Sequence, residues 1–246
     1  MESGRSKVEP LGLALPALEP ASVRHAIRDQ DMLWAEFLAM SRGVLASLET
    51  SIQALLDGKI GVEAEVKNLE RESDREESRI ERQCLRVLAL FEPVASDLRR
   101  MATILKVTRD WERIADLAVR VARRARKFSA AGDRFPIPDR LKTLAQAVLD
   151  HARLVHQALA TRDVAAARAV IRGEDVIDRL HRQVRKELKR SLRPQPETID
   201  LWMQMLSTAR NLERIADHAS DIAQTVVYLE EGVIIRHEEQ VPRPGE

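Results

Sequence analysis

Apolar residues recur every three to four positions through most of this 246-residue chain, with polar and charged residues between them. This spacing places apolar side chains on one face of an α-helix and predicts long amphipathic helices. The 10 prolines fall outside the periodic stretches, and Pro93, Pro138 and Pro196 are expected at or near helix starts. The pattern predicts six helices, at residues 21–56, 60–91, 94–127, 139–160, 164–192 and 197–230.

Short polar breaks separate the predicted helices. Gly58, directly after Asp57, is expected to end the first helix, and Thr161 is expected to cap the N-terminus of the fifth. The segment 128–137 contains glycine and proline and separates the first three helices from the last three. This division into three plus three helices suggests an internal repeat.

The two halves share a sequence motif. The string Glu-Arg-Ile-Ala-Asp occupies residues 112–116 and again residues 213–217, and flanking residues match at the same separation. A second alignment, which allows for a changed loop, matches residues 70–75 with residues 174–179. The predicted fold class is therefore all-α, with two tandem antiparallel three-helix bundles at 21–130 and 138–237. A flexible N-terminal tail is expected at 1–20 and a C-terminal tail at 238–246.

Composition narrows the class of protein. The chain is 44% hydrophobic but only 3% aromatic, which favours helices around an aliphatic core. With 40 basic and 39 acidic residues the formal net charge is +1, so general attraction to nucleic acid or to an anionic membrane is not expected. The single cysteine, Cys84, excludes an intramolecular disulfide and is expected to be a small buried hydrophobe. No apolar run approaches the length of a membrane span, and a cytoplasmic location is expected.

Acidic residues interrupt the apolar faces of four helices. Glu112 and Glu213 continue the apolar rows that contain Leu105 and Leu206, and an aspartate follows each glutamate one helical turn later. The preceding helix of each half carries a matching pair. The four Glu-x-x-x-Asp pairs are Glu70 and Asp74, Glu112 and Asp116, Glu174 and Asp178, and Glu213 and Asp217. Carboxylates on an apolar face are costly unless a positive group lies beside them.

Two kinds of positive partner are compatible with this pattern, and both remain open at this point. One is a structural salt-bridge network with the nearby arginines, Arg109, Arg113, Arg210 and Arg214. The other is a metal ion held by the eight carboxylates. Because the ligands are oxygens and cysteine is absent from the pattern, the expected ions are iron, manganese, magnesium or calcium.

Histidine spacing argues against oxygen-activating chemistry. Diiron bundles carry Glu-x-x-His motifs, whereas neither Glu112 nor Glu213 has a histidine three residues later. His181 and His218 adjoin the acidic pairs but are expected to be half-exposed helix residues rather than ligands. No nucleophile with its base, Gly-rich phosphate loop or dinucleotide motif is present, so catalysis is not indicated.

These residues resemble a known family. The strings DWERIADLA at 110–118 and NLERIADHA at 211–219, the paired acidic motifs in tandem three-helix bundles and the ending Val-Tyr-Leu-Glu-Glu-Gly at 227–232 are similar to the PhoU family of bacterial phosphate regulators. The resemblance extends over residues 21–237. It implies metal ions on the eight carboxylates named above. The chain departs from the common pattern at Ala115 and Ala216, where glycine is frequent, and at Gly173, which precedes Glu174 inside a helix.

The resemblance also implies a function. Such a protein is a non-enzymatic cytoplasmic regulator of phosphate uptake and phosphate-starvation signalling. Its expected partners are the ATPase of a Pst-type ABC phosphate transporter, the sensor histidine kinase of the phosphate regulon and a second copy of the chain as a homodimer. It would reach the membrane only through these partners and would not bind nucleic acid. The alternative is a carboxylate-bridged metal-storage or diiron-type metalloprotein.

Overall fold

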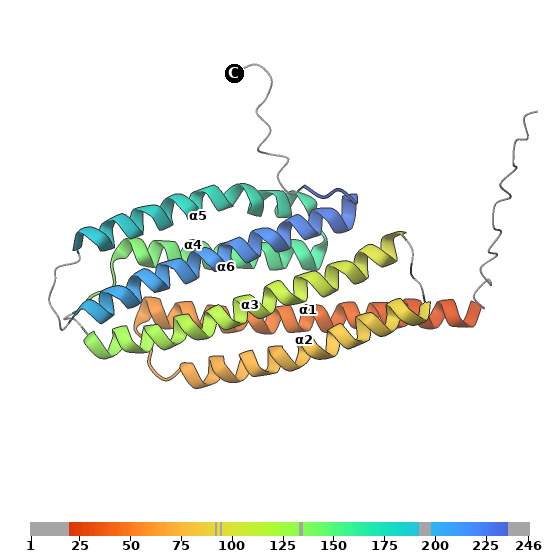
Figure 1. The fold of residues 1–246 in the computed structure, drawn as a ribbon, viewed down its shortest axis with the longest axis horizontal. Helices are drawn as coiled ribbons and strands as arrows, with labels where there is room; N and C mark the ends of the chain where they lie inside the picture. Colours follow the sequence, from red (N-terminus) through yellow and green to blue (C-terminus); the bar gives the residue numbers. More distant parts are fainter. Residues whose placement is uncertain (1–19, 92, 94, 133–134, 192–197, 236–246) are drawn as a thin grey trace, which may run out of the picture.

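A computed structural model describes residues 20–91, 93, 95–132, 135–191 and 198–235. The described chain forms helices connected by short loops (Figure 1). They are α1 (Pro20–Asp57), α2 (Glu63–Phe91), α3 (Ala95–Ala131), α4 (Asp139–Thr161), α5 (Val164–Ser191) and α6 (Ile199–Glu231). The predicted tails at 1–20 and 238–246 lie outside the described residues, apart from Pro20, which begins α1.

Local signals explain where several helices begin and end. Gly58 has a φ of +69°, which glycine adopts without steric cost, and it follows α1 as predicted. Pro138 directly precedes α4, where its missing N–H is not needed. The prediction for Thr161 was wrong: this residue ends α4, and its hydroxyl donates to the carbonyl of Gln157 at 2.9 Å. Asp163 caps α5 instead, because its Oδ1 accepts the backbone N–H of Ala166 at 3.0 Å.

The helices form two antiparallel three-helix bundles, α1–α3 and α4–α6, which lie side by side (Figure 1). The predicted fold class is therefore confirmed. Aliphatic side chains fill both cores, and each fully buried leucine or isoleucine contributes about 1.5–3 kcal/mol of hydrophobic free energy. Cys84 is fully buried, as predicted, and burial raises the pKa of its thiol to about 12. None of the described helices has the unbroken apolar stretch that crossing a lipid bilayer requires.

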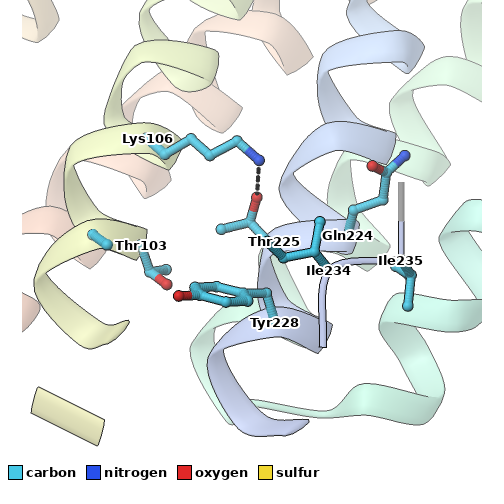
Figure 2. A pocket seen from close by; sticks show the side chains of 8 residues that line it. Thr103, Lys106, Gln224, Thr225, Tyr228, Ile234 and Ile235 are labelled. Atoms are coloured by element: carbon cyan, nitrogen blue, oxygen red, sulfur yellow. Dashed lines mark hydrogen bonds between the residues drawn. The ribbon is translucent and has the colours of Figure 1, made fainter. Parts of the chain in front are cut away.

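The bundles meet along α3 and α6, which run antiparallel. Arg124 of α3 donates to Ser207 of α6 at 2.8 Å, and Lys106 of α3 donates to Thr225 of α6 at 2.8 Å (Figure 2). In the internal repeat, residue 106 corresponds to residue 207 and residue 124 corresponds to residue 225. The two hydrogen bonds thus join equivalent positions of the two repeats. The interface between α3 and α6, called the seam below, therefore has approximate two-fold symmetry.

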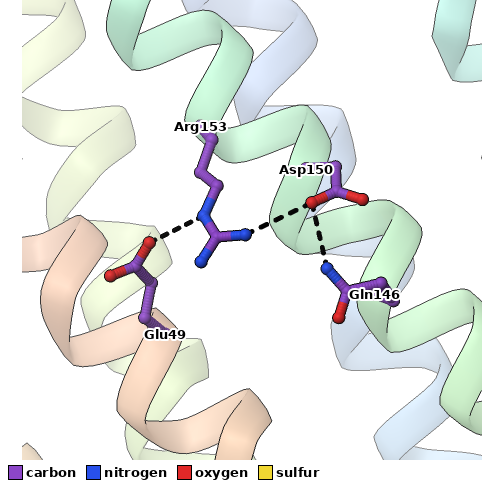
Figure 3. A network of polar contacts seen from close by, with 4 residues as sticks. All are labelled: Glu49, Gln146, Asp150 and Arg153. Atoms are coloured by element: carbon purple, nitrogen blue, oxygen red, sulfur yellow. Dashed lines mark hydrogen bonds and ion pairs between the residues drawn. The ribbon is translucent and has the colours of Figure 1, made fainter.

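A second contact between the bundles joins α1 to α4. Arg153 Nε donates to Oε1 of Glu49 at 2.7 Å across the two helices (Figure 3). The same guanidinium contacts Asp150 at 3.4 Å, and Gln146 donates to that carboxylate at 3.0 Å. These side chains are exposed, so each ion pair contributes less than about 1 kcal/mol.

Candidate functional site

The first carboxylate quartet consists of Glu70 and Asp74 on α2 with Glu112 and Asp116 on α3. Each helix supplies two carboxylates one turn apart, and the helices are packed against each other. The side chains of Glu112 and Asp116 are 16% and 33% exposed, so the quartet lies at the border of the core rather than within it. The small side chain of Ala115, which is buried, lies between the two on α3.

Loss of hydration and neighbouring negative charge raise the pKa of Glu70, Asp74 and Glu112. Loss of hydration raises the pKa of Glu70, and the charges of Asp74 and Asp116 raise it further. The pKa of Asp74 is raised by loss of hydration and then by Asp116. Burial also raises the pKa of Glu112, with Arg113 opposing the shift and Asp116 adding to it. These charge effects place the four residues predicted from α2 and α3 in one neighbourhood, but in the described chain no three of their carboxylates bring an oxygen each within 4.8 Å of one another.

The second carboxylate quartet consists of Glu174 and Asp178 on α5 with Glu213 and Asp217 on α6. Loss of hydration, followed by the charges of Glu213, Glu174 and Asp178, raises the pKa of Asp217 to about 6. The pKa of Glu174 is raised mainly by burial, while a hydrogen bond from Ser220 lowers it. The raised pKa values of Asp217 and Glu174 mean that their ionised forms are disfavoured here, and a bound cation would relieve this cost.

Positive side chains compensate the quartets only in part. Arg113 lies 3.4 Å from Glu112, and Arg120 lies 3.7 Å from Asp116. In the second quartet, His181 Nδ1 lies 3.2 Å from Glu213. Within the described residues, no arginine forms an ion pair with the remaining members, Glu70, Asp74, Glu174, Asp178 and Asp217. The predicted salt bridges with arginine therefore form in part of the first quartet. Among the described residues, the arginine ion pairs expected in the second quartet are not formed.

A buried group behind the second quartet explains Gly173. His151 is 7% exposed, burial lowers its pKa to about 4, and its Nε2 lies 3.4 Å from the hydroxyl of Ser220. A Cβ at position 173 would lie 3.3 Å from Cε1 and Nδ1 of His151. Glycine therefore lets α5 approach the histidine that contacts Ser220, which in turn hydrogen-bonds Glu174.

Sequence reasoning missed one cluster of possible ligands. Asp110 of α3 with His218 and Asp221 of α6 place one ligand atom each within 4.8 Å of one another, and in the part of the chain that the structure describes no other three such residues do so. The i, i+3 spacing of His218 and Asp221 was the only available signal, because Asp110 belongs to the other bundle. His218 is half-buried, as expected, but His181 is buried, so the expectation that it would be half-exposed was wrong.

The chain is similar to proteins of one family. The model of the PhoU domain matches it twice, at residues 37–125 and 141–226. It is 32% identical over 206 residues to the phosphate-specific transport system accessory protein PhoU homolog of Deinococcus radiodurans, which covers 81% of this chain and 96% of that protein. The crystal structure of PhoU from Pseudomonas aeruginosa superposes with a TM-score of 0.79 at 30% identity, covering 84% of this chain and 99% of the other. At 24% identity, the phosphate transport system regulatory protein PhoU from Streptococcus pneumoniae shares the fold, with a TM-score of 0.76.

Proposed function

This chain belongs to the PhoU family, and we propose that it is a non-enzymatic regulator of phosphate uptake and phosphate-starvation signalling. It acts in the cytoplasm as an adaptor between the ATPase of a Pst-type ABC phosphate transporter and a sensor histidine kinase, and it does so as a homodimer. The observation that carries this proposal is the double match to the PhoU domain, which extends over both bundles, together with relatives named as accessory proteins of the phosphate-specific transport system.

We further propose that each carboxylate quartet holds a metal ion. The donor set fits: every member offers carboxylate oxygens, the ligands that iron, manganese, magnesium and calcium accept. Two observations on the second quartet support this proposal: the pKa of Asp217 is raised, and among the described residues no arginine forms an ion pair with its members. A bound cation would neutralise this repulsion and tie α2 to α3 in the first bundle and α5 to α6 in the second.

The Ser220 and His151 pair supports the second quartet from behind. Ser220 donates to Glu174 and so favours its ionised form, which is the form that binds a cation. His151 is held neutral by burial and contacts the same hydroxyl, so no buried positive charge competes for Glu174 from this side. Ser220 thus opposes part of the rise in pKa that burial produces at Glu174.

Membrane capture tests the adaptor function. An affinity-tagged chain expressed at its native level in its own host, cross-linked in phosphate-replete cells, should co-purify with the transporter ATPase and the histidine kinase from solubilised membranes. The control is the same tag on an unrelated soluble helical protein. Capture of neither partner, at a cross-linking yield that recovers the chain itself from the membrane fraction, would contradict the proposal.

A further inference from the structure

The seam between the bundles contains a second, chemically different group of metal ligands. Asp110 projects from α3 of the first bundle, whereas His218 and Asp221 project from α6 of the second, and all three are half-buried. His218 Nδ1 lies 3.2 Å from Oδ1 of Asp110. A cavity of about 620 Å³, lined by Asp110 and Asp221 among others, opens beside them.

We propose that Asp110, His218 and Asp221 form a binding site for a divalent transition metal such as Zn²⁺, which joins the two bundles. One imidazole nitrogen and two carboxylate oxygens are the donor types of borderline metals. With metal–ligand distances of about 2.1 Å, two ligand atoms can lie up to about 4.2 Å apart. The present separations, all within 4.8 Å, therefore require only small side-chain rotations. Water from the cavity can complete the coordination.

The internal duplication provides a comparison for this site. In the repeat alignment, Asp110 corresponds to Asn211, His218 to Leu117 and Asp221 to Arg120. The symmetry-related place in the seam therefore offers no carboxylate and no imidazole. A positively charged side chain of the protein occupies this symmetry-related place. The guanidinium of Arg124 lies against the Asn211 amide and donates to Ser207 and Gln204.

The equivalent of Arg124 on the Asp110 side is Thr225, which carries no charge. Lys106 reaches this threonine from α3 at 2.8 Å (Figure 2) and also lines the cavity. Two aspartates thus replace an amide and an arginine on this side of the seam, and a histidine replaces a leucine. Three possible metal ligands therefore lie together at one of the two symmetry-related places in the seam, and the other place has none of them.

A buried polar group in the cavity wall also supports a bound ligand. Thr108 is 2% exposed, lines the same cavity as Asp110 and Asp221, and its hydroxyl has no hydrogen-bond partner in the described part of the chain. An unpaired buried hydroxyl is costly, and water held in an occupied cavity would satisfy it.

The site differs from the carboxylate quartets in its ligands and its position. It contains a nitrogen ligand, and it takes ligands from both bundles, whereas each quartet lies within one bundle. Asp221 follows Asp217 by one turn on α6, and its charge raises the pKa of Glu174, so the proposed site borders the second quartet. A metal at this place would stabilise the docking of the bundles in addition to any stabilisation within one bundle.

The competing explanation is that protonated His218 and Lys106 neutralise the two aspartates without a metal. Imidazole nitrogen shifts separate the two, because a coordinated nitrogen has a shift unlike that of a protonated one. We would label the full chain with ¹⁵N-histidine, remove metals with a chelator, and titrate Zn²⁺ at neutral pH. The His218→Gln variant assigns the signal. The proposal predicts that about one equivalent of Zn²⁺ moves the His218 nitrogens to metal-bound shifts.

Variants then identify the carboxylate ligands. Asp110→Asn and Asp221→Asn should each weaken the Zn²⁺ affinity read at His218 by about tenfold or more. Asp29→Asn is the matched control, because Asp29 is exposed on α1 and forms no ion pair among the described residues; its titration should be unchanged. A double variant of the second quartet, Glu213→Gln with Asp217→Asn, should keep the His218 response, which separates this site from the quartets.

Two outcomes would overturn the proposal. One is that the His218 nitrogens of the unmodified chain do not move at a tenfold excess of Zn²⁺, which involves no variant and no question of folding. The other is that Asp110→Asn and Asp29→Asn titrate alike, which would remove the first bundle from the site.

Discussion

Asp217 makes the electrostatic cost of the second quartet measurable. Its pKa is raised from 3.8 to about 6, first by loss of hydration and then by Glu213, Glu174 and Asp178. An aspartate in the unfolded chain ionises near its ordinary value. Replacing Asp217 by Asn keeps the shape of the side chain and removes its charge, so we expect Asp217→Asn to stabilise the metal-free protein at neutral pH.

The size and pH range of the effect follow from this shift. A raised pKa means that the folded state holds its proton more tightly, so folding loses stability as pH rises from 3.8 to about 6 and the full cost persists above. Two pKa units correspond to about 3 kcal/mol. Because the side chain is exposed and solvent screens its charge, we expect about 1 kcal/mol. For a chain of this size that is a rise of about 2–4 °C in melting temperature.

Thermal unfolding with chelator present, followed by circular dichroism at pH 7 and at pH 4.5, measures this difference. Asp217→Asn should melt above the unmodified chain at pH 7, and the gap should narrow at pH 4.5, where Asp217 is already largely protonated. Asp29→Asn should show no such pH-dependent gap. A lower melting temperature for Asp217→Asn at pH 7 under chelation, or a gap that does not change with pH, would refute the reasoning.

Two further predictions concern packing and metal. Gly43→Ala should stabilise α1 by about 0.5–1 kcal/mol, because no atom lies within 4 Å of the new methyl group. Gly173→Ala should not give this stabilisation, because its methyl group would lie 3.3 Å from His151. Chemical denaturation measures the free energy of unfolding of both variants, and an equal increase in both would contradict the predicted effect of the His151 contact. The double variant Glu112→Gln with Asp116→Asn should lose the metal of the first quartet and keep that of the second in elemental analysis, and unchanged metal content would remove both residues from the ligand set. The same double variant should be more stable than the unmodified chain under chelation and less stable with saturating metal, where ligand binding adds about 2.7 kcal/mol at a hundredfold excess over Kd; destabilisation under both conditions would favour the salt-bridge interpretation.

Helix positions were predictable because proline and apolar periodicity are local signals. The predicted helix at 139–160 differs from α4 by a single residue at its end. The start of α2 was predicted three residues early, at 60 rather than Glu63, because Gly61 adopts a φ of +91° and prolongs the turn. The end of α3 was predicted at 127, four residues before its observed end at Ala131. No residue in between breaks the helix, and a contact with another part of the chain holds its last turn: the Ser129 hydroxyl donates to the carbonyl of Gly58 at 2.7 Å.

The candidate site was predictable only where it depends on one helix. Residues four apart share a face, so the Glu-x-x-x-Asp pairs could be recognised and matched between the repeats. The burial of His181 against Glu213 depends on how α5 packs on α6. The contact between Asp110 and His218 joins residues 108 positions apart across the bundle interface. No periodicity within a helix carries that information.

A reporter of the phosphate-starvation response in the native host tests the regulatory function most directly. With abundant phosphate, deletion of this chain should switch the reporter on, and expression of the intact chain from another locus should switch it off again. A reporter that stays off in the deletion strain, in cells where starvation still induces it, would contradict the proposal that this chain regulates the phosphate-starvation response.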